Sequence, residues 1–507
     1  MDAGPASETE WKFDVADDVE LPRLTDLHGV KNVDQPIEHR LETEYFDTAD
    51  LRLASRNITL GRRIGGEAAG WVLKLPARVD EPREFHMPVR RTSDGVPKTL
   101  LQRVRVHSRD SVLMPVARLS TRRIVYRLRG DHGDAVADFT DDRVDAQTLQ
   151  PEPASQSWRE WEFELFEAPK DLLDAGKDLI LAAGGRPSAH DSELARVLAT
   201  FLHSTVVSRD SSPPPTDRAG DVVFAYLQEQ LEVIRDQDPR VRQDDHDAIH
   251  KMRVATRRLR SVLATYGSLL EDGDTVRMVR DELKWLAGVL GIARDAEVMH
   301  GRLMEMIANE PADLLLGPVE RRIETELGGD YKKEYGRVMR ALNGQRYFRL
   351  LDSLESLIGA SRLSPRGAKP AKKVIPPLIN QEIKQLRCAV KHARRHPAGI
   401  GDHPGLHDVR KDAKRLRYAA EAARTLGRNE TDRLGETAHG IQKILGDHQD
   451  TIVTRALLRR LGAEAFTQGE NGFSYGRLHA LEQSTALNAE AQFHRGWHRI
   501  PTLSVKK

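Results

Sequence analysis

The chain has 507 residues and a formal net charge of +1, with 78 Lys and Arg against 77 Asp and Glu. This length exceeds what one hydrophobic core supports, so we expect two or three domains. The single cysteine, Cys388, excludes an internal disulfide framework, and we interpret it as a buried, inert thiol in a reducing compartment.

The sequence carries no signal for export or for membrane insertion. Its first ten residues lack the basic start and apolar run of a signal peptide. No window approaches the roughly 20 apolar residues of a membrane span. We therefore expect a soluble protein of the cytoplasm without a membrane partner.

Charge is distributed unevenly along the chain. Residues 1–210 hold 29 Lys and Arg against 37 Asp and Glu, a net charge of −8. The remaining residues hold 49 against 40, a net charge of +9. This asymmetry predicts that the C-terminal part meets an anion.

Several segments in the first 165 residues alternate charged with bulky apolar side chains, which is typical of strands. One charged face alone would be read as the solvated side of an ordinary sandwich. Dense charge of both signs on several strands instead predicts a barrel with a charged lumen. The residues on these faces are Glu8, Glu10 and Lys12 in the first segment, Lys74 in the second, and Glu160, Glu162 and Glu164 in the third.

These segments resemble a CYTH domain, the triphosphate tunnel metalloenzyme family, over about residues 5–205. The resemblance rests on the ExExK start, on YFDTADLRL at 45–53, on the WxLKLP strand and on the ExE strand at 160–164. It implies an eight-stranded antiparallel barrel whose tunnel binds triphosphate or polyphosphate with magnesium or manganese. Known activities of the family include inorganic triphosphatase, thiamine triphosphatase and adenylate cyclase.

The resemblance also implies roles for individual residues. Whether Glu160 and Glu162 or Glu162 and Glu164 form the family's ExE pair stays open, since all three share a face. The expected metal ligands are Glu8, Glu10, Asp142, Glu160, Glu162 and Glu164. The expected catalytic residues are Glu8, Glu10, Lys12 and Lys74, and the expected phosphate site adds Arg63, Glu84, Arg118 and Arg123.

Three positions depart from the family pattern, and each loses a cation. Gly61 stands where the family has the first arginine of LRxR, and Thr121 stands where it has a lysine. Glu193 replaces the lysine of an SK motif. These losses should weaken phosphate binding unless Arg118, Arg122 or His86 substitutes.

Two further segments lie between this region and the rest of the chain. Residues 169–205 show helical periodicity, and we interpret them as packing helices that flank or close the barrel. Residues 207–219 are rich in Ser, Pro and Asp and predict a semi-rigid linker. The predicted domains are therefore 1–206 and 220–500.

The C-terminal part reads as an all-α bundle, with helical periodicity throughout and Gly and Pro in the connections. Within it, HKMRVATRRLR at 250–260 and HDVRKDAKRLRY at 407–418 each place a histidine and three cations on one helix stripe. A third stripe with the same spacing is expected to line the same groove. The three stripes are His250, Arg253, Arg257 and Arg260; His407, Arg410, Lys414 and Arg417; and Lys384, Arg387, Lys391 and Arg394.

The two histidine stripes belong to a longer internal repeat. LGxxxD recurs at 290–295 and 445–450, in the same order after each stripe, which predicts a duplicated half-domain. We expect Asp295 and Asp450 to form ion pairs that orient the basic helices. The cations three positions after His250 and His407 argue against metal binding by these histidines.

This order of motifs resembles the CHAD domain, the conserved-histidine α-helical domain. The resemblance implies two pseudo-symmetric four-helix bundles that bind inorganic polyphosphate. Nucleic acid is the less favoured anion, because aromatic residues are only 5% of the chain and few accompany the stripes. The neighbours Arg258, Lys411 and Arg415 join the three stripes in the predicted polyphosphate site.

The sequence thus predicts an N-terminal antiparallel eight-stranded barrel followed by an all-α domain of two four-helix bundles. The first functional hypothesis is a polyphosphate-binding protein whose tunnel hydrolyses triphosphate or short polyphosphate with Mg²⁺ or Mn²⁺. A second is a binding module with a degenerate tunnel, and a third is an adenylate cyclase. The oligomeric state is left open.

Overall fold

The computed structural model describes residues 9–66, 69–76, 84–88, 95–149, 152–166, 170–190, 192–205, 218–360, 362–395, 404–426 and 428–497. Glu8, a predicted ligand, and most of the predicted linker therefore lie outside the described residues. The chain divides into two compact units, Met1–Asp210 and Ser211–Lys507, and each is described by itself.

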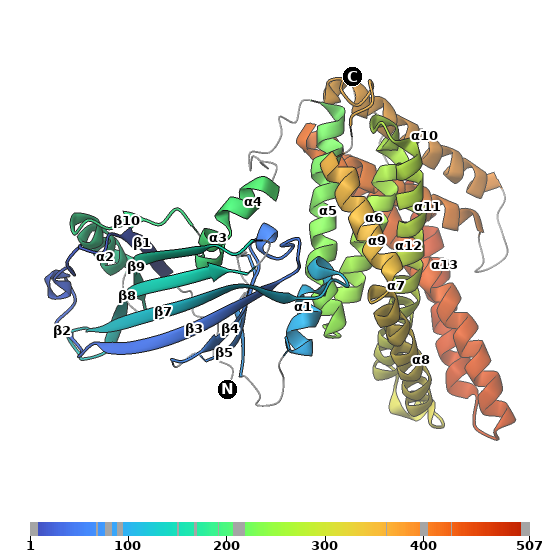
Figure 1. Ribbon diagram of the computed structural model, residues 1–507. Coiled ribbons are helices and arrows are strands. Elements are labelled where there is room, and N and C mark those ends of the chain that lie inside the picture. The colour runs from blue at the N-terminus through green and yellow to red at the C-terminus, as the bar shows by residue number, and fades with distance from the viewer. Residues whose placement is uncertain are drawn as a thin grey trace. The chain divides into compact units, whose positions relative to one another are not determined.

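The first unit is built on a ten-stranded antiparallel sheet in the order β10-β1-β9-β8-β7-β3-β4-β5-β6, with β2 beside β7 (Figure 1). Eight strands have four or more residues, as predicted, and β2 and β10 add two residues each. The strands are β1 (Thr9–Val15), β2 (Asn32–Val33), β3 (Ile37–Asp47), β4 (Thr59–Ile64), β5 (Gly70–Lys74), β6 (Glu84–Met87), β7 (Met114–Arg129), β8 (Ala135–Thr148), β9 (Ser155–Leu165) and β10 (Arg186–Pro187).

Four helices accompany this sheet. They are α1 (Lys98–Ser108), α2 (Lys170–Ala182), α3 (Glu193–Val197) and α4 (Ala199–Thr205). The predicted helical region at 169–205 thus contains α2, α3 and α4, separated by the short strand β10.

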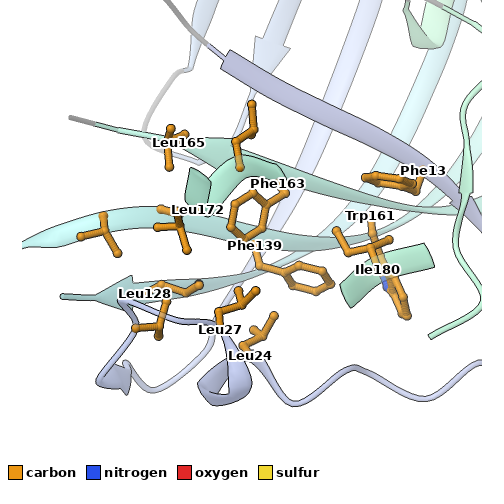
Figure 2. Close-up of a cluster of buried hydrophobic side chains, with 14 of the residues drawn as sticks. Phe13, Leu24, Leu27, Leu128, Phe139, Trp161, Phe163, Leu165, Leu172 and Ile180 are labelled. Atoms are coloured by element: carbon orange, nitrogen blue, oxygen red, sulfur yellow. The ribbon is translucent and has the colours of Figure 1, made fainter. Parts of the chain in front are cut away.

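Helix α2 covers the apolar side of β1, β8 and β9. Figure 2 shows Phe139, Trp161 and Phe163 of the sheet packed with Leu172 and Ile180 of this helix. Trp161 and Phe163 are fully buried. The predicted alternation in β9 is confirmed, because these bulky residues share the face opposite Glu160, Glu162 and Glu164.

Helices α1 and α3 pack on other parts of the sheet. Leu100 and Val104 of α1 join Trp71 and Leu73 in a second apolar cluster. Leu194, Val197 and Leu198 in and after α3 join Val144, Ala146 and Trp158 in a third. Because Val144 and Trp158 share the strand face of Asp142 and Glu160, α3 packs directly on the charged side of the sheet.

The second unit is all helical, as predicted (Figure 1). Its longer helices are α5 (Ala219–Arg242), α6 (Ala248–Tyr266), α7 (Gly273–Ala308), α8 (Val319–Leu342), α9 (Gln345–Ala360), α10 (Ala371–Arg395), α11 (Pro404–Ala422), α12 (Arg428–Thr467) and α13 (Phe473–Trp497).

Helix lengths reveal the duplication expected from the repeated motifs. The series α5 to α8 has 24, 19, 36 and 24 residues, and the series α10 to α13 has 25, 19, 40 and 25. Within each series, consecutive helices pack against each other. Helix α9 joins the two series, so each half is a four-helix unit with the same order of long and short helices.

The halves meet along α6 and α11, the helices that carry the two histidine stripes. The hydroxyl of Tyr266 on α6 donates a 2.8 Å hydrogen bond to the carbonyl oxygen of Ala419 on α11. Thr265 donates at 2.9 Å to Oε1 of Glu382 on α10. Since Tyr266, Thr265 and Glu382 are buried, these bonds fix the alignment of the two halves.

Two sequence-based expectations meet the structure elsewhere in this unit. Cys388 was expected to be buried, but it is exposed on α10, because its neighbours Leu386 and Val390 occupy the packing face. Among the helices that the structure describes, none combines the length and apolar character needed to cross a bilayer.

Candidate functional sites

Strand register gathers titratable side chains on one side of the N-terminal sheet, here called the charged face. Lys12 lies opposite Glu162, and Asp142 lies between Arg123 and Glu160 in the register of three neighbouring strands. The same face continues across β4, β5 and β6 with Arg63, Lys74, Glu84 and His86. Residues paired on neighbouring strands share a face, and the pairs here include Arg63 with Thr43, Lys74 with Thr59, and Lys74 with Glu84. Glu10 and Glu164 lie opposite each other at its margin. The charged face comprises Glu10, Lys12, Arg63, Lys74, Glu84, His86, Arg123, Asp142, Glu160, Glu162 and Glu164.

The two central cations of the charged face are held by carboxylates. Lys12 forms an ion pair with Glu162 and lies 3.4 Å from Glu10. Arg123 donates from Nε to Oδ1 of Asp142 at 2.9 Å and from Nη2 to Oε2 of Glu162 at 2.8 Å. Glu162 therefore connects both cations, and its side chain is only about one-tenth exposed.

Burial and these neighbours shift the proton affinities. Burial opposes charge on Lys12, but Glu162 and Glu10 raise its pKa. Burial likewise opposes charge on Glu162, yet Lys12 and Arg123 lower its pKa below the usual range. Burial, Glu193 and Glu162 together raise the pKa of Glu160 to about 7. The centre thus holds two firmly charged cations beside a carboxyl group that binds a proton readily.

The other cations of this face are more available. The Nε atom of Arg63 is buried and has no hydrogen-bond partner among the described residues. Lys74 forms a 3.1 Å ion pair with Glu84, and its side chain is half exposed. His86 contacts the same carboxylate at 3.1 Å. Guanidinium and ammonium groups of this kind can donate to phosphate oxygens.

One predicted phosphate ligand lies elsewhere. Arg118 points to the opposite side of the sheet, where its Nε donates to Glu44 at 3.0 Å. Arg122, considered as a substitute, pairs there with Glu38 at 2.8 Å. Arg62 also pairs with Glu44 on that side, as expected from strand alternation. The even-numbered residues of β7 face away from Arg123, so Arg118 and Arg122 do not replace the lost cations.

Carboxylate oxygens of Asp142, Glu160 and Glu193 all lie within 4.8 Å of one another. Glu160 is 4% exposed. Its Oε2 accepts a hydrogen bond from Nε1 of Trp158 at 2.6 Å, and its buried Oε1 has no partner in the part of the chain that the structure describes. Hard divalent cations such as Mg²⁺ and Mn²⁺ take oxygen ligands of this kind. The residues present therefore fit a divalent metal.

Sequence reasoning missed Glu193. It was treated only as a lost cation, because a residue in a short helical segment has no predictable orientation toward a sheet. In the structure it accepts a 3.1 Å hydrogen bond from the hydroxyl of Tyr45, which also faces this side of the sheet. A bulky apolar triad directly after it, Leu194, Val197 and Leu198, was the available signal that α3 packs inward.

In the helical unit, four cations gather where α6 meets α11, and they are here called the basic cluster: Arg253, Arg257, Arg410 and Lys414. Each is partly buried. Burial and the neighbouring cations lower the pKa of the three arginines. Burial, Arg257 and Arg410 lower the pKa of Lys414 to about 6.

The cluster has matched supports in the two halves. Arg253 lies over Gly291, where an added Cβ would be 3.4 Å from its guanidinium, and Arg410 lies over Gly446, at 3.8 Å. Asp295 forms an ion pair with Arg253 at 3.1 Å, as predicted. Asp450 is the neighbouring carboxylate that favours charge on Arg410. The glycines of both LGxxxD motifs thus leave room for an arginine of the preceding helix.

Other cations predicted for this site form ion pairs or hydrogen bonds with nearby residues. Arg258 and Arg417 both contact Glu421, at 3.2 and 2.7 Å. Arg415 donates to Oε1 of Gln385 at 2.8 Å. Lys411 pairs with Asp408 at 3.0 Å on the exposed side of α11. These residues surround the cluster, and their charge is largely offset by these partners.

The histidines and the third stripe occupy the surroundings of the cluster. Burial and Arg294 lower the pKa of His250. Nδ1 of His407 lies 3.0 Å from Oε1 of Gln449. Arg260 is exposed, and Arg280 and Arg415 are its cationic neighbours. The third stripe is exposed on α10, namely Lys384, Arg387, Lys391 and Arg394.

Comparison with known proteins finds one family in each of the two units of the chain. The model of the CYTH domain matches residues 6–187, and the model of the CHAD domain matches residues 225–459. The chain is 37% identical over 97% of its length to the uncharacterized protein MT2285 of Mycobacterium tuberculosis (strain CDC 1551 / Oshkosh), of which 96% is covered. This chain belongs to the CYTH–CHAD proteins. The same identity and chain coverage hold for the uncharacterized protein Rv2226 of strain ATCC 25618 / H37Rv.

Solved structures resemble part of this chain at lower identity. PptA from Streptomyces chartreusis is 22% identical, covers 55% of this chain and 99% of its own, and has a TM-score of 0.47. The CHAD domain from the plant Ricinus communis is 24% identical, covers 57% of this chain and 96% of its own, and has a TM-score of 0.45. Likenesses of this size carry no statement about function.

The CYTH and CHAD domains therefore differ in how their charged residues are arranged. The CYTH sheet combines cations with carboxylates that fit a divalent metal, and its family acts on triphosphates. The CHAD bundle concentrates cations between two duplicated halves.

Proposed function

We propose that this CYTH–CHAD protein binds inorganic polyphosphate at the basic cluster of its CHAD domain. We further propose that the charged face of its CYTH domain hydrolyses triphosphate or short polyphosphate with Mg²⁺ or Mn²⁺. The observation that carries the first proposal is the convergence of Arg253, Arg257, Arg410 and Lys414 from the two halves.

Two members of the basic cluster have no direct partner among the described residues. Neither Arg257 nor Lys414 makes an ion pair or hydrogen bond with a described residue. Holding such like charges together raises the free energy of the empty site, and a chain of phosphates relieves that cost. A linear polyanion matches two helices that run their cations side by side. Tyr418 is the aromatic residue beside Arg258 and Arg417, so a stack for nucleic-acid bases is not supported.

On the charged face, the chain's own residues would divide the work. Arg63 and Lys74 bind phosphate oxygens, whereas Lys12 and Arg123 hold Glu162 and Asp142 in place. A bound divalent metal would supply Lewis-acid polarisation of the phosphoryl group and an activated water. Asp142 and Glu160 would hold it, with Glu10 and Glu164 nearby at the margin. His86 and Glu84 orient Lys74 through their shared contact.

Phosphate release from tripolyphosphate with magnesium or manganese tests the enzymatic proposal. The matched variant is Glu8→Gln/Glu10→Gln, which removes two predicted carboxylate ligands. The wild-type chain should release phosphate well above this variant. Equal release by both would establish the binding module with an inactive tunnel, and formation of cyclic AMP from ATP would identify a cyclase instead.

Retention of long-chain polyphosphate tests the binding proposal. Reversing Arg253, Arg257, Arg410 and Lys414 to Glu should abolish retention. The matched control reverses four exposed cations of α8, which changes the net charge equally away from the cluster: Arg321, Lys332, Lys333 and Arg340. Equal loss in both variants would indicate a general charge effect and refute the cluster as the site. A location in the cytoplasm stays a prediction from the sequence.

A further inference from the structure

Glu193 lies beside the charged face, and the roles proposed above do not include it. It is the first residue of α3 and reaches the sheet side of that helix, where Tyr45 donates to its Oε2. Its carboxylate lies near Lys12 and Arg123 and within 4.8 Å of oxygens of Asp142 and Glu160. It therefore belongs to the face although it comes from no strand.

The position of Glu193 is fixed by packing. Leu194 and Leu198 are 1% and 0% exposed in the apolar cluster that includes Val144 and Trp158. Ser192 caps α3 by accepting a 3.1 Å hydrogen bond from the amide of Ala195. Because the residues on both sides are anchored, little backbone entropy remains to be lost when Glu193 binds a ligand.

A second observation, the hydrogen bonding of Glu160, points to a missing partner. Glu160 is 96% buried, and its Oε1 has no hydrogen-bond partner among the described residues, whereas Oε2 accepts a hydrogen bond from Trp158. A buried carboxylate oxygen left without a donor costs free energy that a bound cation removes. Arg123 donates its hydrogen bonds to Asp142 and Glu162 instead.

Negative and positive side chains also gather at different ends of the charged face. Three carboxylates, Asp142, Glu160 and Glu193, gather on the β8, β9 and α3 side. The available cations, Arg63 and Lys74, lie on β4 and β5. Three converging oxygens suit a divalent cation and repel a phosphate group placed directly on them.

We infer that Glu193 is a metal ligand that, with Asp142 and Glu160, holds a divalent cation on the charged face before any phosphate binds. This deepens the proposed triphosphate site and rests on that function only for what the cation does during hydrolysis. Helix α3 thereby contributes a ligand that the strands alone do not provide.

Calorimetric titration of the full chain with Mn²⁺ alone, in buffer free of phosphate and chelator, tests the inference. Glu193→Gln should weaken Mn²⁺ binding at least tenfold, and Glu193→Asp, which keeps the charge on a shorter side chain, should weaken it severalfold. The control is Glu38→Gln, which removes an equal charge on the opposite side of the sheet and should bind as the wild type does. Circular dichroism reports whether each variant is folded.

Wild-type affinity in either folded Glu193 variant would overturn the inference. If Glu193→Gln does not fold, Glu193→Asp decides the question by the same titration. The outcome for the proposed hydrolysis is separate: a wild type that binds Mn²⁺ through Glu193 but releases no phosphate would refute hydrolysis and leave this ligand assignment standing. Phosphate release with Mn²⁺ binding independent of Glu193 would do the reverse.

Discussion

The charged face and the basic cluster treat positive charge in opposite ways. On the charged face, Lys12 and Arg123 are paired with carboxylates that raise their pKa values. In the basic cluster, Arg257 and Lys414 are crowded by other cations, which together with burial lower their pKa values. Lys12 and Arg123 are thus paired within the charged face, whereas Arg257 and Lys414 make no ion pair with a described residue.

This difference predicts different metal requirements. A phosphate group entering the charged face must compete with Glu162 and Asp142 for their cations, so a divalent metal is needed to offset the carboxylates. In the basic cluster, Arg257 and Lys414 have no ion-pair partner among the described residues that a polyphosphate chain would have to displace. We therefore expect chelation by EDTA to abolish triphosphate binding to the CYTH domain and to leave polyphosphate binding to the CHAD domain intact.

The largest expected effect comes from breaking the internal pairing of the charged face. Glu162→Gln should destabilise the CYTH unit by about 2–4 kcal/mol, because Lys12 and Arg123 lose a shared, mostly buried partner. The same change should permit tripolyphosphate binding in EDTA. Urea denaturation and calorimetry measure the two effects. Glu44→Gln, which removes a carboxylate on the opposite side of the sheet, should not permit tripolyphosphate binding in EDTA. If Glu162→Gln does not bind tripolyphosphate in EDTA either, pairing by Glu162 is not what makes the charged face depend on metal.

Next in size is the effect of a single unpaired arginine. Arg257→Ala should weaken polyphosphate binding about 10- to 100-fold, as expected for losing charged hydrogen bonds worth about 1.5–3 kcal/mol. Its neighbour Arg258 is the matched control, since Glu421 already occupies it at 3.2 Å. Arg258→Ala should change affinity severalfold at most. Equal effects of the two substitutions in a filter-binding assay would contradict the distinction between paired and unpaired cations.

A pH dependence should distinguish the basic cluster further. With a pKa of about 6, Lys414 is mostly neutral in the free protein above pH 6, and a bound polyanion restores its proton. Polyphosphate affinity should therefore fall by up to about tenfold per pH unit between pH 6 and 8. Lys414→Met should flatten this part of the profile. Proton uptake in calorimetry checks the cause, and a profile unchanged by the substitution would exclude Lys414.

The same shift fixes the sign of a stability effect. Between pH 6 and the usual lysine range near 10.5, the unfolded chain holds a proton on Lys414 that the free folded protein does not. The free energy of unfolding contributed by Lys414 therefore rises with pH across this window. Thermal melts should show Lys414→Met to be more stable than the wild type at pH 6, with the advantage shrinking toward pH 9.

The smallest expected effect concerns the glycine supports. Gly291→Ala places a methyl group 3.4 Å from the guanidinium of Arg253, while Gly446→Ala leaves 3.8 Å beside Arg410. Each substitution should gain up to about 1 kcal/mol in helix propensity. Gly291→Ala alone should also lower polyphosphate affinity, by a fewfold. Equal affinity in both variants would show that the two halves tolerate displacement of their arginines equally.

Much of the fold followed from residue patterns that are local. The alternation in β9 predicts which of Trp161 and Glu162 is buried among apolar side chains, because strand geometry sends neighbours to opposite faces. The duplicated motifs predict two similar halves, and the helix lengths confirm them. The pairing of Asp295 with Arg253 was likewise predicted correctly.

Other features depended on which segments meet in space. Arg118 was expected on the charged face, but it lies on the opposite side of the sheet. Glu193 was expected only to remove a cation, but it lies beside Asp142 and Glu160 on the charged side. A cation can be assigned to a face only after its strand register is known. The first residue of a short helix can be placed only after that helix is packed.

The sequence by itself determined the two domain families, the charged strand faces and the repeated basic stripes, because these depend on spacing along a single helix or strand. Only the tertiary structure decided which charges remain available. Pairing by Glu162 neutralises Lys12 and Arg123, whereas the contact of α6 with α11 brings Arg257 and Lys414 together without such a partner. Electrostatic free energy depends on distance and burial between residues far apart in the chain, and these are set when the elements pack.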